Sequence, residues 1–288
     1  MRPRVVGLGL CVVDHVYLVD DLEPVERARY RERLVSPGGM TATALVQAAR
    51  LGCDAHLLSA VGDDSEGRAV ARSLRERGVV TKRLLRPKGH HTTAAVVLVA
   101  RRSGERRFVV PDRRALERSV PDFDLTPIAK AAVLLVDGHF PAQALRAVRR
   151  ALECGVPVVG DFNRPGPQVR RLLPFVTHPV VPLEFVRVYT GGDVRATLRQ
   201  LREEYAAQPV VTEGARGGRF LDGRRVRRFR SPRVRVVDTT GAGDAFHGAL
   251  AAALARGRGL EDAVELAARA GARACTALGG LGQFPHSR

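Results

Sequence analysis

The most informative stretch of the sequence is Val237-Asp238-Thr239-Thr240-Gly241-Ala242-Gly243-Asp244-Ala245-Phe246. The β-branched residues of Val234–Val237 predict a strand that runs into the glycine turn, and the small apolar residues after it predict a helix over Gly243–Ala255. A strand, a glycine turn and a helix N-terminus in this order leave free backbone N–H groups and the positive end of the helix dipole facing a ligand. The stretch therefore predicts an anion site at this turn.

A carboxylate, Asp244, stands in the first turn of that predicted helix. Next to a plain phosphate site it would repel the ligand, so its presence makes sense if it removes a proton from a nucleophile that attacks the phosphate. The alternative is an ordinary helix start, where aspartate is favoured as a cap. The residues alone leave both interpretations open.

Short apolar runs alternate with helical patterns along the rest of the chain. We expect strands over Val5–Val13, His56–Val61, Val133–Val136, Val156–Gly160 and Pro209–Thr212. We expect further helices over Met40–Leu51, Ser65–Arg77, Ala142–Glu153 and Glu261–Ala277. This alternation predicts an α/β fold with a doubly wound, mostly parallel sheet flanked by helices, in one domain over residues 1–288.

Two segments, residues 15–36 and 90–113, break this alternation. Both are β-like and rich in charge, and no helical pattern separates their strands. Within the second, Ala94–Ala100 and Arg106–Val110 flank Arg102-Ser103-Gly104-Glu105, which predicts a hairpin turn. Together the segments predict a small β-sheet that projects from the main domain as a lid or a dimer surface.

The DTTGAGD stretch, followed by Phe246, His247 and Gly248, resembles the C-terminal signature of PfkB-type (ribokinase-like) carbohydrate kinases. The resemblance implies that Asp244 is the catalytic base. It implies that the amides of Gly241, Ala242 and Gly243 form the anion hole for the transferred phosphoryl group. Asp238 would order the loop on the nucleotide side.

A second stretch, from Pro37 through the GDDSEG sequence at residues 62–67, resembles the N-terminal signature of the same family. The resemblance implies a substrate site at Gly38, Gly39 and Thr43, where many relatives carry asparagine in place of the threonine. It also implies a sugar-binding Asp14, which we expect to close the first strand at the ligand-binding edge of the sheet.

The nucleotide side resembles the family's T-x-G-x-x-G turn at Thr212, Gly214 and Gly217, which would lie near ATP. The family's metal-linked N-x-x-E motif is degraded, and Glu184 is out of register by one position. No protein metal ligand is therefore assigned, and Mg²⁺ is expected with the triphosphate.

The composition and motifs of the chain argue against several classes of protein. The net charge of +17 comes from scattered arginines, which indicates a basic surface or a field for anionic ligands rather than a nucleic-acid site. No apolar run is long enough for a membrane span, and four scattered cysteines suit a reduced, cytoplasmic protein. Gly7 and Gly9 begin a dinucleotide fingerprint, but Val12 stands at its third glycine, which argues against an NAD enzyme.

The function implied is ATP-dependent phosphorylation of a small sugar, with a ketose favoured and a homodimer formed through the lid. Within the family the motifs look most like those of sulfofructose kinase and ketohexokinase. His139, however, stands where the sulfofructose enzyme carries an anion-binding arginine. The alternatives are a nucleoside kinase, an acidic-sugar (2-keto-3-deoxygluconate-like) kinase, or a non-catalytic regulator that binds a sugar or nucleotide.

Overall fold

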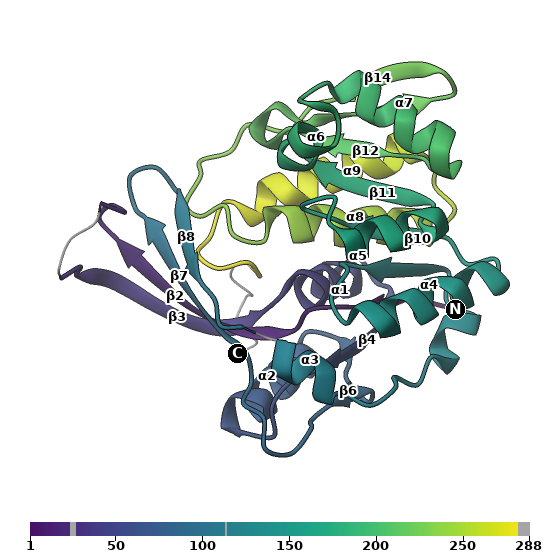
Figure 1. Cartoon of the computed structure of the whole chain (residues 1–288). Coiled ribbons are helices and arrows are strands. Elements are labelled where there is room, and N and C mark those ends of the chain that lie inside the picture. Colours follow the sequence, from purple (N-terminus) through teal and green to yellow (C-terminus); the bar gives the residue numbers. More distant parts are fainter. Residues whose placement is uncertain (24–26, 113, 282–288) are drawn as a thin grey trace.

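A ten-stranded sheet forms the centre of the protein (Figure 1), whose computed structural model describes residues 1–23, 27–112 and 114–281. The strands of this main sheet are β1 (Arg4–Leu8), β4 (Asp54–Ala60), β5 (Val79–Val80), β6 (Leu84–Leu85), β9 (Val133–Val136), β10 (Val158–Asp161), β11 (His178–Pro182), β12 (Val210–Thr212), β13 (Gly218–Asp222) and β14 (Arg225–Phe229). Their order is β14-β13-β12-β11-β10-β9-β1-β4-β5, with β6 beside β4. The pairs from β12 to β5 and β6 are parallel, and β13 pairs antiparallel with β12 and β14.

Helices cover both faces of the main sheet. One face carries α1 (Met40–Arg50), α2 (Ser65–Glu76), α8 (Ala242–Leu254) and α9 (Leu260–Ala274). The other carries α4 (Pro141–Glu153), α5 (Pro167–Leu172), α6 (Leu183–Thr190) and α7 (Val194–Tyr205). Shorter helical segments are α3 (Arg114–Ser119), η1 (Thr126–Lys130), η2 (Leu173–Phe175) and η3 (Gly214–Arg216).

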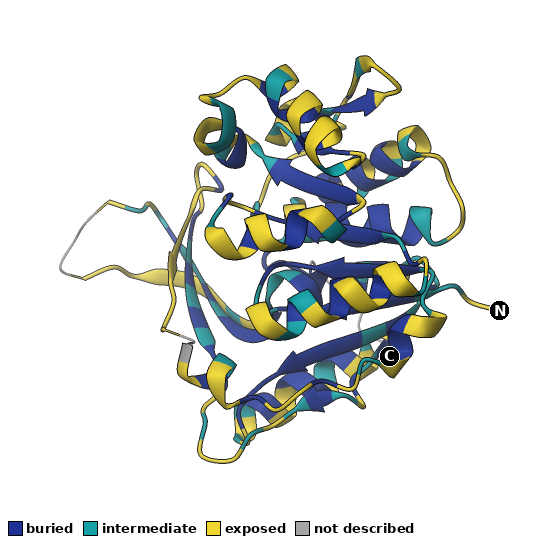
Figure 2. Cartoon of the chain, turned by 45° about the vertical axis from the view of Figure 1, so that its right-hand side comes forward, coloured by how far each residue is buried: buried dark blue, intermediate teal, exposed yellow. Residues whose placement is uncertain are grey.

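The core has two layers, one on each side of the sheet. Successive strand residues point to opposite faces, and the neighbours Leu57 and Leu58 of β4 are both fully buried, one in each layer. Figure 2 shows the inner strands of the main sheet as buried and the exposed residues on the outward sides of the helices. The predicted doubly wound sheet is confirmed.

Helices α1 and α8 touch backbone to backbone. A Cβ atom at Gly248 of α8 would lie 2.0 Å from the carbonyl oxygen of Ala44 in α1, so any side chain there would push the helices apart. Because α8 packs between α1 and α9, its residues Ala245–Ala253 are buried. The helix that carries Asp244 is therefore held on two sides.

The second sheet, called the lid sheet below, projects from one edge of the molecule (Figure 1). Its strands are β2 (Val12–Val19), β3 (Tyr30–Gly38), β7 (Ala94–Ala100) and β8 (Arg106–Val109), in the order β3-β2-β7-β8. The hairpin predicted around Gly104 is confirmed, since β7 and β8 pair antiparallel. On its inner face Val16, Val97 and Val99 pack against Leu278.

Two strand predictions were wrong. Val5–Val13 is not one strand: the chain leaves the main sheet after Leu8, the amide of Leu10 donates to Asp137, and Val12 starts the lid sheet. Asp14 therefore lies inside β2 and does not close the first strand. The segment Val234–Val237 is irregular and exposed. It runs alongside the end of α9, where the amide of Val237 donates to the carbonyl of Cys275, and it pairs with none of the described strands.

Candidate active site

The glycine turn before α8 is the centre of the candidate site, and we call residues 238–243 the anion loop. Gly241 caps α8 with a positive φ of 74°, and a Cβ there would lie 2.3 Å from the carbonyl oxygen of Gly280. A Cβ on Gly243 would meet nothing within 4 Å. The backbone at Gly243, in the first turn of α8, therefore borders open space, which a phosphate group fits.

Asp238 holds the anion loop in shape. It is fully buried, and its two carboxylate oxygens accept hydrogen bonds from the amides of Thr240 and Gly279, each at 2.8 Å. These contacts tie the loop to the chain after α9. Since Asp238 has no exposed surface, its contribution to nucleotide binding would be indirect.

Asp244 follows the anion loop in the first turn of α8. Burial raises the pKa of its carboxyl to about 8, and the charges of Asp161 and Asp14 add to this shift, while His247 and Arg106 oppose it. Such a carboxyl takes up a proton readily near neutral pH, which is what a general base requires.

A buried pair, Asp161 and His247, lies behind Asp244. The Nδ1–H of His247 donates to the carbonyl of Gly243 at 2.7 Å, and the same nitrogen lies 3.3 Å from Oδ2 of Asp161. Burial and the charge of Asp137 raise the pKa of Asp161 well above its ordinary range. The carboxyls of Asp161 and Asp244 are thus coupled, so that ionisation of one disfavours ionisation of the other.

Asp137, directly after β9, fixes the chain before β2 and at the start of α1. One of its oxygens accepts from the amide of Leu10 at 2.7 Å and from the hydroxyl of Thr41 at 2.9 Å, and the other lies 2.9 Å from Nδ1 of His139. Burial would raise the pKa of Asp137, but His139 and the backbone amides outweigh it and hold the pKa low. Asp137 therefore remains charged and joins β1, α1 and β9 at one point.

Asp14 and Gly38 lie together on neighbouring lid strands. A Cβ at Gly38 would lie 2.0 Å from Oδ2 of Asp14, so the glycine leaves the room that this carboxylate occupies. Asp14 is 7% exposed, and burial, with a contribution from Asp238, raises its pKa to about 7. Gly39 is the residue before α1, and its positive φ of 95° turns the chain from the lid sheet into that helix.

Thr43 lies one turn further along α1 and is buried. It lines a cavity of about 560 Å³ between α1 and α9, whose wall also includes Ala245, the residue after Asp244. The structure thus places Thr43 in a cavity that Ala245 lines and that no residue of the anion loop lines. Its predicted contact with a sugar hydroxyl stays a prediction.

On the nucleotide side, Thr212 ends β12 and the next residues form η3. A Cβ at Gly214 would meet nothing within 4 Å, whereas one at Gly217 would lie 2.1 Å from the carbonyl oxygen of Phe229. Gly214 therefore leaves room for a ligand, and Gly217 is required by the close approach of β14.

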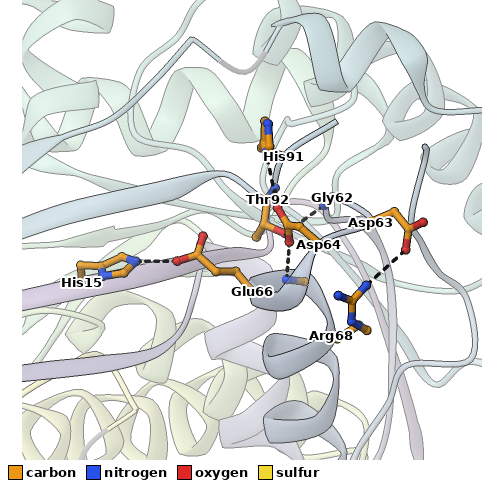
Figure 3. Close-up of polar contacts among 9 residues, drawn as sticks. His15, Gly62, Asp63, Asp64, Glu66, Arg68, His91 and Thr92 are labelled. Atoms are coloured by element: carbon orange, nitrogen blue, oxygen red, sulfur yellow. Dashed lines mark hydrogen bonds and ion pairs between the residues drawn. The ribbon is translucent and has the colours of Figure 1, made fainter. Parts of the chain in front are cut away.

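The base of the lid sheet is tied to α2 through Asp64 (Figure 3). Its carboxylate caps α2 at the amide of Gly67, at 2.7 Å, and also accepts from the amide and hydroxyl of Thr92, at 2.7 and 2.6 Å. Nearby, His15 of β2 lies 3.0 Å from Glu66 of α2. The GDDSEG stretch thus anchors both β2 and the chain that enters β7.

Sequence reasoning missed four residues that the fold brings to this site: Asp137, Asp161, His247 and Arg106. The two aspartates follow or end buried parallel strands, and carboxyl ends of such strands form ligand sites, so this signal was available. His247 lies within the quoted C-terminal signature but had no role assigned to it, and Arg106 offered no comparable local signal.

A buried carboxyl with a raised pKa, next to a helix N-terminus that borders open space, fits a phosphotransferase with an alcohol group as acceptor. The sequence profile of the pfkB family carbohydrate kinases matches residues 2–286. The chain therefore belongs to the pfkB family of carbohydrate kinases.

Individual relatives agree with this family. Ribokinase of Bacillus subtilis is 30% identical over 86% of this chain and 84% of its own. Fructokinase of Salmonella typhimurium is 29% identical over 100% of this chain and 98% of its own. A ribokinase-like protein of Agrobacterium tumefaciens has a solved structure with a TM-score of 0.91 and 30% identity, covering 98% of this chain and 94% of that one. They support the family rather than the finer similarity to sulfofructose kinase.

No helix within the described ranges combines the length and the apolar character that a membrane crossing needs.

Proposed function

We propose that this carbohydrate kinase transfers the γ-phosphoryl group of ATP to a primary hydroxyl group of a small uncharged sugar. Among such sugars we favour a ketose. The observation that carries the proposal is Asp244, with its raised pKa, directly after Gly243, whose backbone borders open space. Asp244 would remove the hydroxyl proton, and Gly241, Ala242 and Gly243 would stabilise charge on the phosphoryl group.

ATP fits the residues that are present. Gly243 and Gly214 both face space that a Cβ would enter without contact, so the phosphates could approach the backbone at these two places. Thr212, Gly214 and Gly217 would hold the nucleotide, with Asp238 shaping the loop from behind.

Mg²⁺ would enter with the triphosphate and neutralise part of its charge. Over residues 1–23, 27–112 and 114–281 the structure contains no group of three His, Cys, Asp or Glu side chains that could hold a metal. Glu184 forms an ion pair with Arg164 and lies 4.0 Å from Arg187. These cations already satisfy its carboxylate, which argues against a direct metal role.

Charge around the substrate side favours an uncharged sugar over an acidic one. Asp14, Asp137 and Asp161 are all buried there, and burial, with a contribution from the charge of Asp238, raises the pKa of Asp14. A substrate carboxylate or sulfonate next to Asp14 would be repelled.

The test is release of ADP from Mg-ATP with a panel of sugars and nucleosides that includes fructose, ribose, sulfofructose, 2-keto-3-deoxygluconate and adenosine. We expect one uncharged sugar to stimulate turnover strongly. Selective stimulation by adenosine would identify a nucleoside kinase instead. Tight ATP binding without stimulation by any member would favour the non-catalytic regulator.

The rate should depend on pH in a way set by two carboxyls. Asp244 acts as a base only when ionised, and its pKa is raised to about 8, while the sugar-binding Asp14 has a pKa of about 7. We therefore expect kcat/KM to fall about tenfold per pH unit below pH 8 and more steeply below pH 7. A profile that stays flat between about pH 6 and 9 would contradict this assignment. In Asp14→Asn the acidic limb should follow a single ionisation.

Gly38→Ala should weaken sugar binding without affecting the nucleotide. The added Cβ would lie 2.0 Å from Oδ2 of Asp14 and would displace that carboxylate. We expect KM for the sugar to rise about tenfold or more, as for the loss of a charge-assisted hydrogen bond. KM for ATP should change little. Gly166→Ala is the control, because a Cβ there meets nothing within 4 Å.

We also propose that two copies pair through the outer face of the lid sheet. Val35, His15, Val96 and Val109 form a row across that face by strand register, and Val35 and Val109 are 47% and 59% exposed. Such exposed β-branched residues are stabilised by burial against a partner. We expect a dimer in sedimentation experiments and a monomer for Val35→Glu with Val109→Glu. Val188→Glu, at a residue 60% exposed on α6, should stay dimeric.

A further inference from the structure

The tip of the lid hairpin rests on the anion loop. The guanidinium of Arg106 donates to the carbonyl of Thr239, and the hydroxyl of Thr239 donates to the carbonyl of Gly104 at 3.3 Å. A Cβ at Gly104 would lie 3.0 Å from Val236. These two hydrogen bonds join residues that are 133 and 135 positions apart in the chain.

Strand register places Arg106 on the inner face of the lid sheet. It pairs with Val99, and Phe108 pairs with Val97; both valines belong to the inner apolar cluster with Val16. The Arg106 guanidinium also lies 5.4 Å from the ring centre of Phe108. Its neighbour Arg107 pairs with Leu98 and points to the opposite face.

Arg106 is a cation in a site dominated by carboxyls. It bonds to the anion loop two residues before Gly241, and its charge lowers the pKa of Asp244, against the effect of burial and of Asp161. A guanidinium presents a planar fork of donors that matches the oxygens of a phosphoryl group.

We propose that Arg106 is a catalytic residue that the lid hairpin brings to the γ-phosphoryl group of ATP. This inference rests on the proposed function. It implies that the lid sheet supplies Asp14 to the sugar site and Arg106 to the phosphoryl site. Both sites would then be complete only with the lid sheet in place.

In the transfer step the sugar hydroxyl gives its proton to the carboxylate of Asp244, and its oxygen forms the new bond to the γ-phosphorus. The bond from that phosphorus to the bridging oxygen breaks, and its electron pair stays on ADP. Arg106 gains and loses no proton. It donates hydrogen bonds to the non-bridging oxygens, over which negative charge is spread in the transition state.

The test compares Arg106→Ala and Arg106→Lys with Arg107→Ala, a charge-matched control on the same strand. Calorimetric titration with Mg-ADP and with Mg-AMP-PNP, a non-hydrolysable ATP analogue, reports binding without turnover. For Arg106→Ala we expect affinity for AMP-PNP to fall about tenfold and affinity for ADP to stay within about twofold. With the responding sugar, kcat should fall about 10²- to 10³-fold in Arg106→Ala and less in Arg106→Lys.

Three results would contradict the role of Arg106, and a fourth would contradict the proposed function. Unchanged AMP-PNP binding in Arg106→Ala, or an equal loss for ADP and AMP-PNP, would overturn the role of Arg106, since a residue that only props the loop would not distinguish the two nucleotides. An effect of Arg107→Ala as large as that of Arg106→Ala would overturn it too. If the unaltered protein binds neither nucleotide, the proposed function itself fails.

Discussion

Asp244→Asn should lower kcat by about 10²- to 10⁴-fold, the range that a positioned general base supplies. Asparagine keeps the size and position of the side chain at the start of α8 but cannot accept the sugar proton. KM for the sugar and for ATP should change little, because the loss concerns the transition state. Retention of more than a few per cent of turnover would rule out Asp244 as the base.

Asp244→Asn should be more stable than the unaltered protein at alkaline pH. Its loss of activity would then come from the missing base and not from unfolding. The pKa of Asp244 is raised from 3.8 to about 8 in the folded state. A carboxyl whose pKa is raised by folding contributes most to stability below its pKa in the unfolded chain. That contribution is lost as the pH rises through its pKa in the folded protein. An asparagine side chain at this position has no such dependence, so thermal denaturation near about pH 8 should show a higher Tm for Asp244→Asn.

Gly241→Ala should reduce kcat by about 10²- to 10³-fold, comparable with the loss of an anion-hole donor. The new Cβ would lie 2.3 Å from the backbone oxygen and 2.4 Å from the Cα of Gly280, so the loop must move away from the chain that follows α9. Backbone atoms cannot rotate aside as a flexible side chain can. The displaced amides would no longer point at the phosphoryl group, and steady-state kinetics would measure the loss.

Gly257→Ala is the control for backbone strain. Gly257 has the same φ of 74°, but a Cβ there meets nothing within 4 Å. Both variants carry the cost of a non-glycine residue at positive φ, and only Gly241→Ala adds the collision. Equal activity in the two variants would show that the contact with Gly280 has no part in shaping the anion loop.

Features that depend on local sequence were predictable. The glycine turn, the helix after it and the hairpin at Gly104 each follow from a few neighbouring residues, and the structure has all three. The alternation of strands and helices predicted the doubly wound sheet, because parallel strands need long connections between them.

Features that depend on distant contacts were not predictable. Val234–Val237 has the composition of a strand, but strand formation needs a neighbour with free hydrogen-bonding groups, and here the neighbour is the end of α9. The break after Leu8 depends on Asp137, 127 residues away from Leu10. The contact of Arg106 with Thr239 likewise spans 133 residues. No local pattern encodes such pairs.

The crossing of α1 and α8 at Gly248 has a consequence for which hydroxyl is phosphorylated. Under the proposed function, the sugar-binding glycines lead into α1 and Asp244 lies in the first turn of α8. The missing side chain of Gly248 would then set how far apart the acceptor and donor halves of the site are held. Two backbones in direct contact can hardly move closer together, because the packed interior is not easily compressed. The enzyme would therefore select a hydroxyl by its reach from the sugar ring, and regiochemistry would be a property of helix spacing as much as of the groups that bind the sugar.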